Sequence, residues 1–126
     1  MLLNVLLVAV GGACGSVLRY LVTLAGTRWL GPDWPSGTVF VNVSGSLLMG
    51  VAVEMITRRF GGSGELRLLL TTGFLGGYTT FSSFSLDAAV LWERGDTLAS
   101  LVYVLGSVGL GLVALFAGLA LARHML

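Results

Sequence analysis

Four long apolar runs, separated by short polar segments, divide the chain of 126 residues. They cover about residues 2–25, 37–56, 66–92 and 98–122. About 20 apolar residues in helical conformation cross the roughly 30 Å hydrocarbon core of a bilayer, so each run is long enough to be a span. The pattern predicts an all-α membrane protein, with residues 1–126 forming a single domain of four transmembrane helices.

The third run contains a stretch that does not suit an ordinary lipid-facing helix. Gly76 and Gly77 each disfavour a helix by about 1 kcal/mol relative to alanine, and Thr79 and Thr80 follow closely. We therefore predict a break between residues 76 and 80, near the bilayer midplane. Two roles fit a break at this depth. Its freed carbonyls form hard oxygen ligands of the kind that sodium accepts, or the glycines only allow close helix packing.

Beyond the predicted break, aromatic and hydroxyl side chains alternate. Phe81 and Phe84 are three residues apart and share a helix face. Ser82, Ser83 and Ser85 place hydroxyls around the other sides. The phenylalanines fit either ordinary packing or the lining of an ion path.

The second run carries a stripe of polar and small residues. Thr38, Asn42, Gly45 and Ser46 recur at helical spacing on an otherwise apolar helix. An amide buried in lipid needs partners. Asn42 can bond a backbone carbonyl on another helix, or its NH₂ group can donate to an anion.

Several other polar positions lie within the apolar runs. Arg19 in the first run must snorkel, find a partner or line an aqueous entrance. Asp87 in the third run either faces a vestibule or pairs with an arginine. In the fourth run, Tyr103 and Ser107 are four apart and either continue a hydroxyl track or pack among small residues.

Composition supports the membrane interpretation and narrows the function. Hydrophobic residues make up 56% of the chain and charged residues only 10%, which is far from the soluble average. No clustered basic patch suits nucleic acid. The single Cys14 allows no intrachain disulfide. With His124 as the only histidine and no nucleophile, base and metal-ligand set, an enzyme is not expected. The first run lacks a charged leader and continues past Cys14, so we expect a retained helix rather than a signal peptide.

The arginines are nearly balanced between the two ends of the predicted bundle. Four (Arg58, Arg59, Arg67 and Arg123) lie on the side of the termini, and Arg28, Arg94 and Arg19 lie toward the other. The positive-inside rule then has little bias to act on. Such a chain can insert in both orientations, and we predict an antiparallel, dual-topology homodimer joined through glycine-rich faces. Glu54 and Arg58 are expected to pair along one helix.

The third run resembles the small fluoride-channel family, the Fluc or CrcB-type proteins. That family's third helix reads close to Gly-Phe-x-Gly-Gly-x-Thr-Thr-Phe-Ser-Thr-Phe-Ser. Here Ser83 replaces threonine and keeps the hydroxyl, whereas Tyr78 replaces the commoner leucine and is bulkier. The second run, Gly-Thr-x-x-Val-Asn-x-x-Gly, is also similar, and the first carries Gly-x-x-x-Arg followed by Tyr20 where tryptophan is commoner.

This resemblance implies a passive fluoride channel of the bacterial inner membrane, with two pores in an antiparallel homodimer. Backbone carbonyls of Gly76 and Thr79 would hold a central structural sodium ion, and Arg19 would lie at an anion vestibule. The implied partners are fluoride, the lipid bilayer and a second copy, with no nucleic acid. The implied fluoride path comprises Asn42, Phe81, Phe84, Ser82, Ser83, Thr38, Tyr103 and Ser107.

Two rival functions fit a chain of this size. Small proton-coupled multidrug exporters also have four helices, but they share a membrane-embedded glutamate in the first helix, and this chain has no carboxylate there. A subunit that only scaffolds partners would leave Asn42 and the serine cluster without a role.

Overall fold

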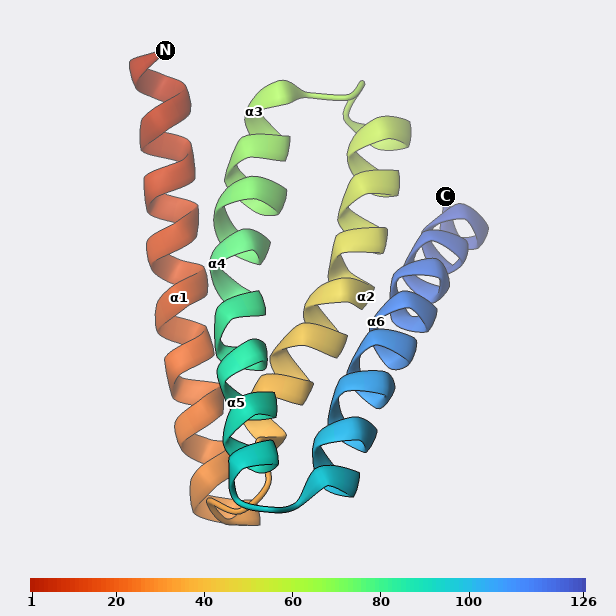
Figure 1. The fold of residues 1–126 in the computed structure, drawn as a ribbon. Helices are drawn as coiled ribbons and strands as arrows, with labels where there is room; N and C mark the ends of the chain where they lie inside the picture. Colours follow the sequence, from red (N-terminus) through yellow and green to blue (C-terminus); the bar gives the residue numbers. More distant parts are fainter.

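The two termini lie at the same end of the molecule as the turn after the second helix (Figure 1). The computed structural model describes residues 1–126. Three uninterrupted helices, α1 (Leu2–Leu30), α2 (Ser36–Arg59) and α6 (Thr97–Met125), are long and apolar enough to cross a membrane. The remaining crossing is made of consecutive pieces: α3 (Gly64–Leu66), η1 (Arg67–Leu75), α4 (Gly76–Tyr78) and α5 (Phe81–Glu93). The chain is a multi-pass membrane protein, as predicted.

The long helices continue beyond the apolar runs that predicted them. α1 has 29 residues, which corresponds to roughly 43 Å at 1.5 Å per residue. α1 is therefore longer than the roughly 30 Å hydrocarbon core and extends beyond it. α1 ends at Gly31, whose φ of 87° only glycine adopts easily. α6 begins after Asp96, whose carboxylate accepts a hydrogen bond from the Ala99 amide at 3.3 Å.

Glycines allow α1 to pack closely against the third crossing. A Cβ on Gly11 would stand 2.3 Å from the Leu69 carbonyl oxygen, and one on Gly15 would stand 2.0 Å from the Phe74 carbonyl oxygen. Backbone on both sides leaves no room for such an atom. The chain itself covers these two glycines, so they are not free to join two copies.

The other close pair is formed by α2 and α6. A Cβ on Gly50 would lie 2.3 Å from the Leu115 carbonyl oxygen, and one on Gly118 would lie 2.1 Å from the Leu47 carbonyl oxygen. Two further glycines of α6, Gly106 and Gly109, have no such neighbour within 4 Å of a Cβ built on them. The small-residue face that stays free lies on α6.

The first part of the third crossing is wound more widely than an α-helix. Residues Arg67–Leu75 form a π-helix, and the Gly76 amide donates to the Thr71 carbonyl five residues earlier. Nothing in the apolar pattern predicts this winding. It directly precedes the break.

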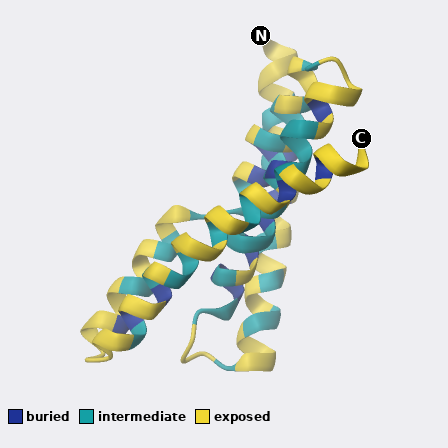
Figure 2. Ribbon diagram, turned by 90° about the vertical axis from the view of Figure 1, so that its right-hand side faces the viewer, coloured by how far each residue is buried: buried dark blue, intermediate teal, exposed yellow.

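Little of the surface is buried within one copy (Figure 2). Only 16 of 126 residues are buried, and Val41, Leu75 and Tyr78 form the small core. Large apolar side chains such as Phe81 and Phe116 are 79% and 66% exposed. A surface of this kind suits lipid or a second subunit rather than water.

Candidate functional site

The third crossing is interrupted at two extended residues, inside the predicted window. α4 ends at Tyr78, and Thr79 (φ −84°, ψ 159°) and Thr80 (φ −151°, ψ 121°) are extended before α5 starts at Phe81. The Thr80 hydroxyl accepts a hydrogen bond from the Ser83 amide at 3.1 Å. Thr80 is therefore the N-cap that starts the second half of the helix.

Asn42 of α2 holds the break from the side. Its Nδ2 donates to the Thr80 carbonyl at 3.0 Å, and its Oδ1 accepts from the Thr80 amide at 2.8 Å. One side chain thus replaces both backbone partners that Thr80 lost when the helix ended. This is the interhelical role predicted as one of two for Asn42. The second N–H of the amide is not used in these bonds.

The carbonyls of Gly76 and Thr79 are among those that lose their helical partners at the break. In a continuous helix they would accept from the amides of Thr80 and Ser83, four residues later. Both amides are bonded elsewhere, to Asn42 and to the Thr80 hydroxyl. These are the two carbonyls predicted as sodium ligands.

Arg19 reaches the same break from α1. Its Nε donates to the Gly77 carbonyl at 3.0 Å, which satisfies a further backbone acceptor freed by the interruption. Of the three roles predicted for Arg19, the structure shows the one in which the side chain finds a partner. The guanidinium Nη groups make no hydrogen bond to the protein and are free to meet a ligand.

The donor set fits an oxygen-bound monovalent ion and not a side-chain metal centre. No group of three or more His, Cys, Asp or Glu side chains gathers in the chain. Carbonyl oxygens at an unwound helix are ligands that sodium accepts. The Gly76 and Thr79 carbonyls are two such oxygens in one copy, and two alone are too few to surround an ion.

Tyr78 packs into the core beside the break. It is 5% exposed, its ring stacks on Phe74 at 6.2 Å, and its hydroxyl lies 3.0 Å from the Ser44 hydroxyl. Gly45 makes the space, because a Cβ there would stand 2.3 Å from Thr79 Cγ2 and 3.3 Å from Tyr78 Cδ2. The bulk of the tyrosine is accommodated within the subunit.

Two adjoining cavities open beside the break. One, of about 380 Å³, is lined by Asn42, both threonines of the break and both phenylalanines, together with Ser46 and Met49. The other, of about 280 Å³, shares Asn42, Phe81 and Phe84 and adds Ser107. The Ser107 Oγ is buried and has no hydrogen-bond partner. Of the predicted path, these cavities bring together Asn42, both phenylalanines and Ser107.

An aromatic line runs from the break toward the first loop. Ring centroids are 5.8 Å apart between Phe81 and Phe84, 5.3 Å between Phe84 and Tyr103, and 5.6 Å between Tyr103 and Trp34. The pair of Tyr103 and Trp34 meets edge to face, at 84°. Trp34 was not among the residues predicted for the path, so its place in this line was missed. Since the contact joins a loop to α6, no spacing along the chain signals it.

Several predicted residues lie outside these cavities. The Tyr103 hydroxyl donates to Asp87 Oδ2 at 3.1 Å, so Asp87 pairs with a tyrosine and not with an arginine. Thr38 is buried. Ser82 is exposed, with its hydroxyl 3.4 Å from that of Thr80. Ser83 contributes its amide to the cap of α5.

Comparison with known proteins gives matches over nearly the whole chain. The model of the family described as CrcB-like protein, Camphor Resistance (CrcB), matches residues 6–119. A protein from Rhizobium etli named Fluoride-specific ion channel FluC is 56% identical over 124 residues, which cover 98% of this chain and 99% of the relative. Proteins of the same name from Rhizobium meliloti and Agrobacterium fabrum are 57% and 53% identical. They cover 97% and 98% of this chain, and 98% and 99% of their own lengths.

Proposed function

The chain belongs to the CrcB-like protein family, and we propose that it is a fluoride channel that lets the anion leave the cytoplasm passively. Two antiparallel copies would enclose two pores and share one central sodium ion. The observation that supports fluoride as the transported ion is the full-length similarity to relatives named fluoride-specific ion channels. Since these relatives are ion channels, the chain is not an enzyme.

Fluoride is small and strongly hydrated, so a pore has to replace its water with donors. The cavities beside the break offer the unused N–H of Asn42, the unpartnered Ser107 hydroxyl and the edges of Phe81 and Phe84. A phenyl ring is electropositive at its edge and negative at its face. The rings would therefore have to meet the ion edge-on.

Sodium would act as a fixed positive charge at the centre of the dimer. The carbonyls of Gly76 and Thr79, which lose their helical partners, would be its ligands. Under a two-fold axis in the membrane plane, each of these oxygens appears twice, so four backbone oxygens would converge on one ion. This supports the use of the break as a cation site shared by two copies.

A second copy would also cover apolar surface that one copy leaves open. Phe81 projects from the break with 79% of its surface exposed, although it lines both cavities. Opposed insertion follows from the near balance of arginines at the two ends. Trp34 and Tyr103 would continue each path from the phenylalanines toward the membrane surface.

No energy source is required for export. A potential of about 100 mV, negative inside, favours the exit of one anion by about 2.3 kcal/mol. The physiological role would be protection of the cytoplasm from fluoride, with the protein in the bacterial inner membrane.

The test is ion efflux from liposomes. Purified protein is reconstituted in vesicles loaded with potassium fluoride, valinomycin is added, and external fluoride is read by an electrode. We expect rapid fluoride efflux and none of chloride in matched vesicles. Proton flux driven by a cationic drug, without fluoride efflux, would contradict the proposal and favour the exporter.

A further inference from the structure

An apolar groove lies between α2 and the first half of the third crossing, at the end that carries both termini. Its walls include Leu48, Val51 and Met55 on one side and Leu66 and Leu70 on the other, and all ten lining residues are hydrophobic. The groove has a volume of about 390 Å³. None of its residues belongs to the cavities beside Asn42.

The dimensions of the groove fit one hydrocarbon chain. From Leu48 to Phe60 the α2 wall rises roughly 18 Å at 1.5 Å per residue, close to the roughly 15 Å depth of one leaflet. A volume of about 390 Å³ over this length describes a narrow groove. Carbon atoms in contact lie about 4 Å apart, so a single extended chain fits along it.

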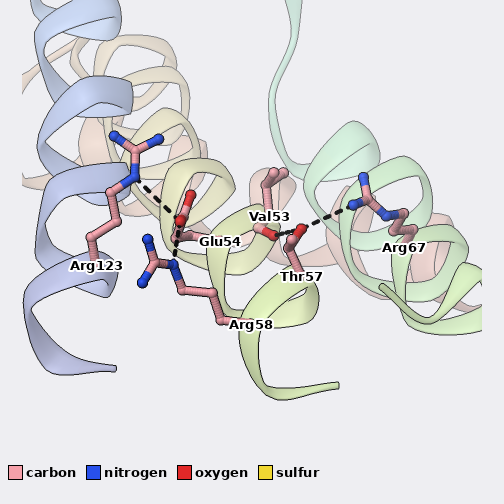
Figure 3. A network of polar contacts seen from close by, with 6 residues as sticks. All are labelled: Val53, Glu54, Thr57, Arg58, Arg67 and Arg123. Carbon is pink, nitrogen blue, oxygen red and sulfur yellow. Dashed lines mark hydrogen bonds and ion pairs between the residues drawn. The ribbon is translucent and has the colours of Figure 1, made fainter. Parts of the chain in front are cut away.

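Basic residues stand at the mouth of the groove. Arg59 follows Met55 and Ile56 at the spacing of one helical turn, so it continues the same face of α2 toward the surface. From the opposite wall, Arg67 Nη2 donates to the Thr57 hydroxyl at 3.1 Å and so reaches across to α2 (Figure 3).

Acidic residues compete little for these two arginines. Glu54 is already engaged by Arg58 at 2.6 Å and by Arg123 at 3.2 Å (Figure 3). Only Glu65 remains beside the mouth, and it is exposed. The mouth is therefore net positive, and it lies where the headgroup of a lipid would lie if its acyl chain filled the groove.

We propose that this groove binds one acyl chain of an anionic phospholipid, with the phosphate held by Arg59 and Arg67. The positive charge at the mouth and the apolar groove of leaflet depth both fit an anionic phospholipid. The site does not depend on fluoride conduction. In an antiparallel dimer it would occur once in each leaflet.

The test is native mass spectrometry of the whole protein, titrated with phosphatidylglycerol or with phosphatidylcholine of the same acyl chains. We expect a phosphatidylglycerol adduct that persists where phosphatidylcholine is lost. Removing one arginine near an anionic headgroup weakens attraction about fivefold, so Arg67→Gln and Arg59→Gln should each weaken retention by that factor. Arg94→Gln, at the opposite end of the molecule, is the matched control and should not change it.

Two further experiments distinguish binding of the acyl chain from binding of the phosphate alone. Ala52→Phe, which fills the groove, should abolish the adduct, and glycerol 3-phosphate without acyl chains should not compete. Equal retention of both lipids, or Arg59→Gln and Arg67→Gln variants that behave like Arg94→Gln, would overturn the proposal. So would a change from dimer to monomer in the Ala52→Phe spectrum, because a second copy would then occupy the groove. Thermal unfolding like that of the parent protein establishes that each variant has folded.

Discussion

Asn42 satisfies a donor and an acceptor of Thr80 at the same time, so its chemistry should be more important than its size. In Asn42→Asp the shape is kept and the Thr80 amide is still accepted, but a carboxylate oxygen then faces the Thr80 carbonyl. We expect the protein to be destabilised by about 1–3 kcal/mol, since a buried acceptor loses its donor. Fluoride efflux should fall at least tenfold. Thermal unfolding and the liposome assay measure the two effects.

The matched control is Asn4→Asp, the same change at an exposed position in the first turn of α1. A new carboxylate there is compatible with the helix dipole, so stability and efflux should stay close to those of the parent protein. Equal behaviour of the two variants would show that Asn42 does not hold the break.

Thr80 caps α5 and, by doing so, keeps the Ser83 amide away from the Thr79 carbonyl. Thr80→Val preserves the shape and removes the cap, which should cost about 1 kcal/mol. The freed amide can then bond to Thr79. If that carbonyl is a sodium ligand, the sodium concentration that supports half-maximal efflux should rise severalfold. Thr80→Ser keeps the hydroxyl and should leave it unchanged; equal midpoints in the two variants would argue against sodium at the break.

At the scale of elements, α2 and the break fit together only because Gly45 has no side chain. A methyl group there would stand 2.3 Å from Thr79 Cγ2, and Thr79 cannot turn freely because its hydroxyl donates to the Leu75 carbonyl at 2.9 Å. Gly45→Ala should therefore cost about 1–3 kcal/mol through overpacking and sharply reduce efflux. Thermal unfolding and efflux give the two readouts.

Gly12→Ala supplies the comparison for this change. The nearest atom to a Cβ on Gly12 is 3.9 Å away, which is ordinary contact, and alanine favours a helix. This variant should be as stable as the parent protein or more so. If both alanine variants were equally tolerated, the close fit at Gly45 would not constrain the break.

The sequence predicts these elements well where composition alone decides and poorly where packing decides. Adjacent glycines followed by threonines disfavour a helix locally, so the break falls inside the predicted window of residues 76–80. The π-helix before it packs closely against Gly11 and Gly15 of α1, and no local pattern encodes its winding. The helix ends were predicted short because hydropathy falls at the membrane surface while the backbone bonds continue.

The site shows the same division. Phe81 and Phe84 on one face, and the polar stripe with Asn42, follow from helical spacing. The bonds from Asn42 to Thr80 and from Tyr103 to Asp87 join different elements. A partner was one of three roles predicted for Arg19, but the Gly77 carbonyl becomes available only once the break exists.

For the whole molecule, the exposed apolar surface and the balanced arginines lead to a prediction about insertion. Gly64→Lys with His124→Lys adds two positive charges on the side of the termini, at positions that are exposed. Asp33→Lys with Glu93→Lys adds two on the opposite side, also at exposed positions. Lys and Arg in short loops set orientation, so each double variant should insert in one direction only.

If the pores form only between opposed copies, each of these variants alone should lose nearly all fluoride efflux, and expressing both together should restore it. Orientation is measured by labelling a cysteine placed at Thr97, in a Cys14→Ser background, with a membrane-impermeant reagent. Gly64→Gln with His124→Gln, which adds no charge, should behave like the parent protein. A variant with one orientation that still conducts fluoride on its own would show that antiparallel pairing is not required, because parallel copies or single chains would then suffice for the path.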